Sequence, residues 1–315
     1  MGVLQPGHFR FVNRVVSLLG APFSYGQPKP GAELGVSALR RAGIVPSLEE
    51  LRWHVDDLGD LEFEGPADND NFGILKRPRC VGNANRRVKE MVYNACRKDN
   101  FVLTLGGDHS IATGTVAGHK LARPDLCVVW VDAHADINTV ESTPSGNIHG
   151  MPISWLFGLN KQKVPGYEWV PEKPLLSFGD LVYIGLRDVD AGEKELLRKH
   201  HIHSFSMTEI DRYGIGTVVE KALDQVNPYR NRPIHISLDV DACDPSVVSA
   251  TGTMVRGGLS FREAHYLCEA LGETGLVAGM DLVEINPMLG DDQSADAAAK
   301  IGLSMVRSVL GDTLL

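Results

Sequence analysis

Short apolar runs and amphipathic stretches alternate along most of this chain. From Phe101 onward, apolar runs that end at Gly, Pro or Asp are followed by stretches in which apolar residues recur every three or four positions. The first pattern is typical of buried strands and the second of amphipathic helices. We therefore expect strands at 101–105, 127–132, 181–186, 202–205, 234–239 and 276–283. We expect helices at 110–122, 151–159, 191–200, 215–226, 261–273 and 295–310.

The first hundred residues follow the same rhythm less regularly. Their pattern predicts strands at 15–19 and 55–58 and helices at 34–41 and 86–98. Residues 60–79 are rich in Asp, Asn, Gly and Pro without apolar periodicity, so we expect an irregular surface segment there. Residues 1–12 are polar with Gly and Pro, which predicts a flexible N-terminal segment.

Strands separated by helical crossovers predict an α/β fold. We expect a three-layer αβα arrangement, in which a mainly parallel sheet of about eight strands has helices on both faces. No linker rich in Pro, Gly or Ser divides the chain, and no repeat is visible. Residues 13–315 are therefore expected to form one catalytic domain.

Composition narrows the possible partners. A net charge of -9 disfavours nucleic acid and anionic membranes, because both repel an acidic protein, and it favours a small cationic substrate. Five cysteines without a C-x-x-C pair favour reduced thiols over a disulfide framework. The sequence shows no signal peptide, no apolar run long enough to span a bilayer and no peroxisomal address, so we expect a cytoplasmic protein.

A polar cluster, D-A-H-A-D, ends the apolar run 127–131. In extended chain, residues i, i+2 and i+4 project to one face, so Asp132, His134 and Asp136 would converge. A single Asp at a strand end usually caps a helix or closes a turn. Two carboxylates and an imidazole at this spacing instead favour a ligand site.

Two further strand ends carry side chains of the same kind. Asp239 and Asp241 share one face after the run 234–238, and His109 follows the strand at 101–105. The carboxyl ends of parallel strands meet at one edge of a sheet, where open α/β proteins bind their ligands. Four carboxylates gathered there would repel one another unless cations neutralise them.

The six side chains suit two divalent cations. Oxygen ligands with a minority of imidazole and no thiolate favour Mn²⁺ over Zn²⁺. Two ions ~3.5–4 Å apart would hold a bridging water and lower its pKa, which supplies hydroxide at neutral pH. The cluster therefore predicts a hydrolase.

Six motifs resemble the arginase family of the ureohydrolase superfamily. They are, in chain order, G-G-D-H-S, D-A-H-A-D, S-G-N-I-H-G, I-G-L-R-D-V-D, D-V-D-A-C-D-P and E-I-N-P. The resemblance runs from about residue 20 to the last expected helix, and D-A-H-A-D together with D-V-D is highly specific for the superfamily. Ala242 and Cys243 depart from the family pattern, but neither is a ligand.

The resemblance implies two Mn²⁺ per subunit as cofactors. One ion would be held by His109, Asp132, Asp136 and Asp239, and the other by Asp132, His134, Asp239 and Asp241. A metal-bridging hydroxide would attack the guanidinium carbon of L-arginine and yield L-ornithine and urea. His149 would deliver the proton to the leaving amine, Asp136 would accept a hydrogen bond from the hydroxide, and Glu284 would bind the guanidinium group.

The resemblance also implies which residues recognise the amino-acid end of the substrate. Neutral donors would bind the α-carboxylate and acids the α-amino group. The expected contacts are Asn138, Thr143, Ser145 and Asn147 for the first, Asp188, Asp190 and, further out, Glu193 for the second, and Thr253 in the pocket wall.

The assembly expected from the resemblance is a homotrimer. Arg262 and Glu263 match a position of inter-subunit ion pairs in the family, although exposed pairs are weak alone. The chain stops soon after its last expected helix, so the long carboxyl tail of some family trimers is expected to be missing.

Alternatives remain open at this point. An agmatinase or a hydrolase of another guanidino acid would share the metal ligands but not the pattern around Asn138, Ser145 and Asp190. A metal-free regulatory or scaffold homologue should have lost ligands, and all six are present. A two-metal phosphoesterase would need basic residues or a phosphate-binding loop beside the metals, and here the loops carry acids.

Overall fold

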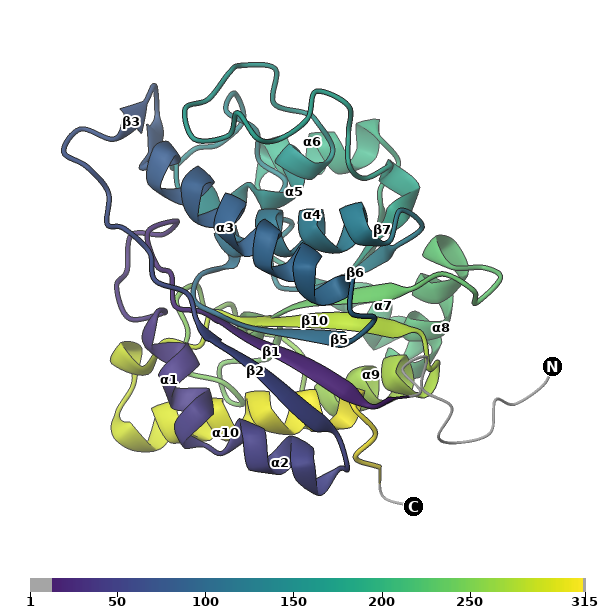
Figure 1. Cartoon of the computed structure of the whole chain (residues 1–315). Coiled ribbons are helices and arrows are strands. Elements are labelled where there is room, and N and C mark those ends of the chain that lie inside the picture. The colour runs from purple at the N-terminus through teal and green to yellow at the C-terminus, as the bar shows by residue number, and fades with distance from the viewer. Residues whose placement is uncertain (1–12, 314–315) are drawn as a thin grey trace.

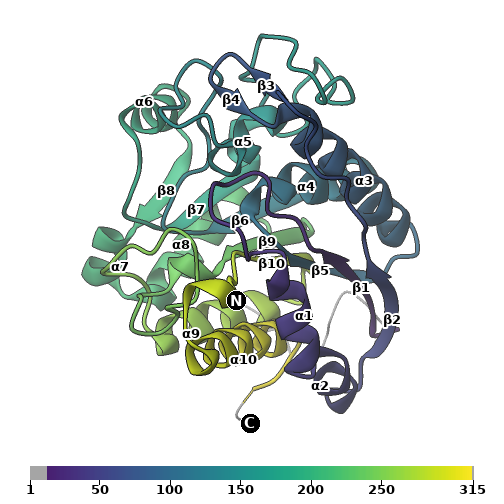
Figure 2. The same ribbon diagram turned by 90° about the vertical axis from the view of Figure 1, so that its left-hand side faces the viewer.

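A computed structural model describes residues 13–313, so the predicted flexible segment 1–12 lies outside the described residues. One parallel sheet of eight strands forms the centre, in the order β2-β1-β5-β10-β9-β6-β7-β8. Figure 2 shows these strands from β2 on the right to β8 on the left. They are β1 (Val15–Ala21), β2 (His54–Asp60), β5 (Phe101–Gly106), β6 (Cys127–Val131), β7 (Leu181–Leu186), β8 (His203–Ser206), β9 (Ile234–Asp239) and β10 (Val277–Val283).

Helices cover both faces of the sheet (Figure 1). One face packs against α1 (Leu34–Arg41), α2 (Ile44–Glu50), α7 (Met207–Tyr213), α8 (Ile215–Val226), α9 (Phe261–Glu273) and α10 (Asp292–Val309). The other packs against α3 (Pro78–Cys96), α4 (Ala112–Ala122), α5 (Pro152–Leu156) and α6 (Ala191–Lys199). Among residues 13–313, no helix is long and apolar enough to cross a membrane.

The predicted fold class is confirmed: the layers are αβα, and all eight expected strands are present. The helices α2 and α7 were not predicted, because seven residues are too few to show a clear helical period. Helix α3 begins at Pro78 instead of residue 86, inside the segment expected to be irregular. That segment also contains a small antiparallel hairpin of β3 (Asn71–Phe72) and β4 (Leu75–Lys76).

Alternation along the central strands explains the two packed faces. In β6, Val129 and Val131 join the core beneath α8 and α9, whereas Val128 and Trp130 face α4 and α5. Both sets are fully buried, which is why β6 reads as a continuous apolar run and not as an alternating one.

The order of the strands creates the crevice for a site. The chain passes from β5 to β6 across the positions that β10 and β9 fill later, so loops from both halves of the chain meet at one edge. Open α/β sheets bind ligands at such a point, where loops from neighbouring strands run in different directions and leave a crevice between them.

Gly107 holds the ends of β1 and β10 close to the end of β5. Its amide donates to the Ala21 carbonyl at 3.0 Å, and its own carbonyl accepts from the Glu284 amide at 2.8 Å. A Cβ at Gly107 would lie 1.8 Å from the Phe23 carbonyl oxygen, which is backbone and cannot rotate away.

We therefore expect Gly107→Ala to lower the free energy of unfolding by more than about 2 kcal/mol, because overpacking would displace the backbone. Chemical denaturation followed by circular dichroism measures the change. Gly179→Ala is the matched control, since a Cβ at Gly179 meets nothing within 4 Å. Equal stability of the two variants would contradict the prediction that a side chain at position 107 displaces the backbone.

Candidate active site

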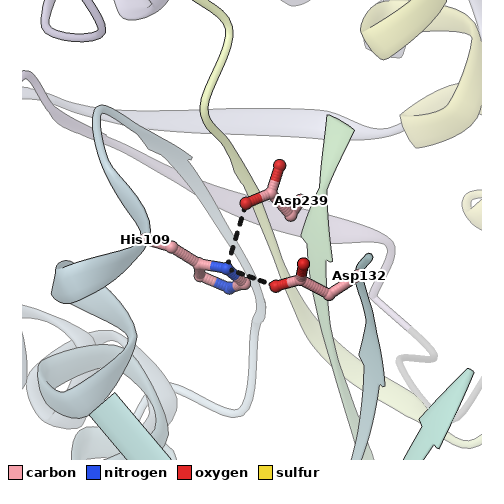
Figure 3. A group of neighbouring side chains, drawn as sticks. All are labelled: His109, Asp132 and Asp239. Atoms are coloured by element: carbon pink, nitrogen blue, oxygen red, sulfur yellow. Dashed lines mark ion pairs between the residues drawn. The ribbon is translucent and has the colours of Figure 1, made fainter. Parts of the chain in front are cut away.

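His109 lies at the centre of one group of acids. It follows β5 in a short 3₁₀ turn, and its Nδ1 lies 3.0 Å from an oxygen of Asp132 and 3.3 Å from oxygens of Asp136 and Asp239. Figure 3 shows Asp132 and Asp239 pointing at the same ring nitrogen from β6 and β9. Three carboxylates from two strand ends thus surround one imidazole nitrogen.

His134 lies at the centre of a second group. Its Nδ1 is 3.3 Å from the Oδ1 atom of Asp132 and 3.2 Å from an oxygen of Asp241. Asp132 therefore presents one oxygen to each imidazole, which is the arrangement expected of a bridging ligand. Asp239 pairs with His109, and its Oδ1 atom accepts from the backbone amide of Asp241 at 2.8 Å, so its role as a bridging metal ligand stays a prediction.

Neighbouring donors orient these carboxylates. The Trp130 indole donates to Asp132 at 3.0 Å, and its ring stacks on His109 with centroids 4.1 Å apart. Ser237 hydrogen-bonds the Nε2 atom of His109 at 2.9 Å. Trp130 and Ser237 were not predicted from the sequence. Each stands two positions before a predicted ligand on the same strand face, and this spacing is the signal that could have found them.

Burial and mutual repulsion dominate the electrostatics of the site. Burial and the charge of Asp132 raise the pKa of Asp241 to about 6. Burial, Asp241 and Asp132 raise the pKa of Asp239 well above its usual range. Burial alone would lower the pKa of His109, but its close contacts with the carboxylates of Asp132, Asp136 and Asp239 outweigh burial and raise that pKa.

The donor set fits divalent cations. Two groups of ligand atoms, each within 4.8 Å of one another, share Asp132. The Nδ1 atom of His109 and the Oδ2 atom of Asp241 are buried and make no hydrogen bond with the described residues. Buried polar atoms that lack hydrogen bonds but face carboxylates or an imidazole are what a metal ion would satisfy.

A cavity of about 130 Å³ opens beside the two groups. The eight residues expected to recognise the amino-acid end of the substrate all line it, together with four of the expected catalytic and metal residues. They are Asn138, Thr143, Ser145, Asn147, Asp188, Asp190, Glu193 and Thr253, with His134, Asp136, His149 and Asp239.

Hydrogen bonds hold the polar wall of this cavity in place. The Asn138 side chain donates to Asp190 at 2.8 Å, and the Ser142 hydroxyl donates to the Oδ1 atom of Asn138 at 2.8 Å. Glu193 is 4% exposed and accepts from the amides of Ile137 and Asp190. It closes a capping box at the start of α6, so it has a structural function in addition to facing the cavity.

His149, which lines the cavity, lies beside the buried Glu284. The Nδ1 atom of His149 is 3.6 Å from an oxygen of Glu284. Burial opposes protonation of His149, but Glu284, Asp136 and Asp108 outweigh it and raise its pKa. Glu284 and Asp136 both have left-handed backbone, with φ values of 66° and 50°. Such strain in non-glycine residues is concentrated at functional sites.

Asp108, the neighbour of His109, closes a turn. Its carboxylate accepts from the Ser110 amide at 2.9 Å and from the Gly26 amide at 2.7 Å. The side chain therefore points away from the two imidazole-centred groups and connects two loops.

Arg187 also holds the site in place and was not predicted from the sequence. Its guanidinium group donates to five backbone carbonyls, the shortest bonds being 2.6 Å to Asp241 and 2.8 Å to Val255. It thereby ties the loop that carries Asp241 to the loop after Thr253. The motif R-D-V-D does not indicate that its Arg binds backbone carbonyls, because most of those carbonyls belong to segments far away in the sequence.

We expect Arg187→Met to lower the free energy of unfolding by about 3 kcal/mol and to weaken binding of divalent cations, because buried carbonyls lose their donor. Denaturation and metal titration measure the two effects. Arg198→Met, at an exposed position on α6, is the control and should change stability by less than about 0.5 kcal/mol. Unchanged metal binding in Arg187→Met would show that Asp241 does not depend on this arginine.

Without metal, stability should fall as the pH rises from 6.5 to 8. Burial and Asp136 raise the pKa of Glu193 to about 8, and that of Asp241 is about 6. The pKa values of His109 and His134 also lie above the ordinary 6.5, because their contacts with acids outweigh burial. The folded protein therefore binds more protons than the unfolded chain in this window. His119, whose pKa burial lowers, acts in the opposite direction, chiefly near and below pH 6.5.

The expected loss between pH 6.5 and 8 is on the order of 2 kcal/mol in chelator-treated protein. Urea denaturation at several pH values measures it. Loading with a divalent cation should remove or reverse the trend, because metal binding favours deprotonated ligands. A metal-free protein that gains stability over this window would contradict the assignment.

Comparison with known proteins places the chain in a family. The arginase family model matches residues 14–307. The chain is 48% identical over 309 residues to an arginase from Glaciozyma antarctica (strain PI12), covering 96% of this chain and 89% of that protein. It is 49% identical over 278 residues to arginase-1 from Bos taurus, covering 87% and 86%.

Solved structures agree with the sequence comparison. The native structure of arginase from Bacillus caldovelox superposes with a TM-score of 0.89 at 35% identity, covering 96% of this chain and all of that one. The residues 14–307 that match the family model include both imidazole-centred groups and the cavity. The chain therefore belongs to the arginase family.

Proposed function

We propose that this protein hydrolyses L-arginine to L-ornithine and urea. The observation that carries the proposal is the composition of the cavity. Its wall holds the neutral and acidic side chains expected to bind the α-carboxylate and α-amino group of the substrate, and the two His/Asp groups lie beside it. The identity of 44–49% to several arginases over most of the chain supports it.

We propose two Mn²⁺ per subunit as the cofactor. The first would be held by His109, Asp132, Asp136 and Asp239, and the second by Asp132, His134, Asp239 and Asp241. When bound, the pair supplies charge stabilisation and an activated water for attack on the guanidinium carbon. Oxygen-rich ligands without thiolate favour manganese over zinc.

The protein's own side chains would bind the reacting end of the substrate and move protons. Glu284 is buried, and its carboxylate can accept charge-assisted hydrogen bonds from a guanidinium group. His149 lines the cavity 3.6 Å from Glu284, within reach of the leaving amine, and its raised pKa suits a proton donor near neutral pH. Asp136, beside His109, is placed to accept a hydrogen bond from the attacking water.

The α-carboxylate and α-amino group of arginine would bind to the polar wall of the cavity. Neutral groups on Asn138, Thr143, Ser145 and Asn147 would bind the α-carboxylate, and Asp188 and Asp190 the α-amino group, with Glu193 behind them and Thr253 in the wall. Agmatine lacks the carboxylate, so this wall is the feature that favours arginine over agmatine. A scaffold role without metal is disfavoured because both ligand groups are assembled.

We also propose a homotrimer. Arg262 is exposed at the start of α9, near the exposed aromatic side chains of Phe261 and Tyr266. Glu263 accepts from Ser260 within its own subunit, so one of its oxygens is already engaged. Exposed aromatic and Arg side chains are enriched at protein interfaces. Light scattering on eluted protein would give the mass of the assembly.

We propose that residues 13–315 act as a single catalytic domain in the cytoplasm. The one continuous sheet supports a single domain. All five cysteines are buried free thiols, which suits a reducing compartment. Fractionation of cells with an antibody against the protein would test the location.

Urea release from arginine and agmatine, measured in parallel on manganese-loaded protein, tests the proposed reaction. We expect metal-dependent turnover of arginine and at least about a hundredfold lower kcat/KM with agmatine, because its missing carboxylate leaves the neutral donors unpaired. A chelated sample is the control. Turnover of agmatine alone would overturn the assigned roles of Asn138 and Ser145.

His149→Asn should keep the bound manganese and lower kcat about a hundredfold or more, because the variant cannot shuttle a proton. Metal analysis and steady-state kinetics give the two quantities. His54→Asn, at an exposed position on β2, serves as the control. A near-normal rate in His149→Asn would assign the proton transfer to another group.

A further inference from the structure

Gln27 is a buried polar residue in the loop between β1 and α1. This loop, G-A-P-F-S-Y-G-Q-P-K-P-G, is rich in Gly and Pro, yet the Gln27 side chain is only 3% exposed. A buried amide must make its hydrogen bonds within the protein. The acceptor of the Gln27 side-chain NH₂ group therefore indicates the function of this residue.

The Gln27 amide donates to Glu284. The distance from Nε2 to the Oε2 atom of Glu284 is 2.9 Å. The backbone amide of His109 donates to the other oxygen, Oε1, also at 2.9 Å. Two neutral donors, one on each oxygen, set the plane of a carboxylate that is 1% exposed and carried on left-handed backbone.

The loop itself is held firmly at this point. The Gly26 amide donates to Asp108 at 2.7 Å, and the Gly26 carbonyl accepts from the His149 amide at 3.1 Å. The Lys29 ammonium donates to the Gly252 carbonyl at 2.5 Å. A Cβ at Gly252 would lie 2.9 Å from the Oε1 atom of Gln27, so the absence of a side chain at Gly252 leaves room for the Gln27 side-chain amide.

We propose that Gln27 is a positioning residue for the guanidinium end of the substrate. It orients Glu284 through one hydrogen bond and does not itself line the cavity. The inference rests on the proposed function, in which Glu284 receives the guanidinium group. It predicts that Gln27 sets affinity for the guanidinium group and not for the amino-acid end.

The chemistry explains why an amide suits this position. A carboxylate that must bind a cation needs an orienting partner that leaves its negative charge in place. A Lys or Arg at position 27 would itself neutralise Glu284 and compete with the substrate, whereas a neutral amide donor fixes the geometry and keeps the charge.

Gln27→Met tests the proposal, because it keeps the length of the side chain and removes the donor. We expect KM for arginine to rise about tenfold, with kcat reduced by less than about threefold, since one hydrogen bond to a charged acceptor is lost. Gln27→Glu should raise KM further, because its carboxylate repels Glu284. The inhibition constant of ornithine, which has no guanidinium group, should stay within about twofold of wild type.

Lys29→Met is the matched control. It removes another side-chain bond of the same loop but does not touch Glu284, so KM for arginine should change by less than about threefold. Metal analysis should give the same manganese content in all variants. Parallel increases in arginine KM and ornithine inhibition constant would show general loosening of the site and overturn the proposal. An unchanged arginine KM in Gln27→Met would overturn it as well.

Calorimetric titration of guanidinium chloride into manganese-loaded protein separates this inference from the proposed reaction. We expect weaker guanidinium binding in Gln27→Met than in the wild type. If the wild type releases no urea from arginine, the proposed function fails, but the titration still decides the role of Gln27. Equal guanidinium affinity in both proteins, or no measurable binding to either, would contradict it.

Discussion

The burial of several carboxylates at one edge of a sheet is the constraint on which the rest of this structure depends. Asp132, Asp239 and Asp241 are at most 3% exposed, and each lies close to at least one of the others. Buried like charges are unfavourable unless protons or cations neutralise them. The raised pKa values of Asp239 and Asp241 express this repulsion, and the shared position of Asp132 between two imidazoles indicates where cations would relieve it.

Much of the surrounding structure holds these charges in place. Trp130 and Ser237 orient the first ligand group from neighbouring strands, and Arg187 ties the Asp241 loop through backbone carbonyls. Gln27 and the His109 amide do the same for Glu284. All these partners are neutral donors except Arg187, whose charge is directed at carbonyls. These donors therefore orient the acids without neutralising them.

The sequence predicted the eight strands and the convergence of the ligands because both follow from local periodicity. Apolar runs that are buried on both faces are easy to recognise, and alternate residues at the end of a strand must share a face. The short helices α2 and α7 were missed because seven residues carry too little periodic signal. Residues 60–79 were misjudged in part, since the first turns of α3 owe their helical form to packing. The Gly82 carbonyl, for example, accepts from the Trp169 indole, and a Cβ at Gly82 would meet the backbone of Gly166.

By itself, the sequence determined the αβα architecture, the six ligand side chains and, through motif resemblance, the residues that line the cavity. Only the tertiary structure decided that Asp132 faces both imidazoles, that Glu193 caps α6 and that Gln27 holds Glu284. Spacing along a strand determines which residues share a face, because it depends on local geometry. Contacts between Gln27 and Glu284, or between Arg187 and Val255, join segments far apart in the chain, and only the packing of the whole sheet brings those segments together.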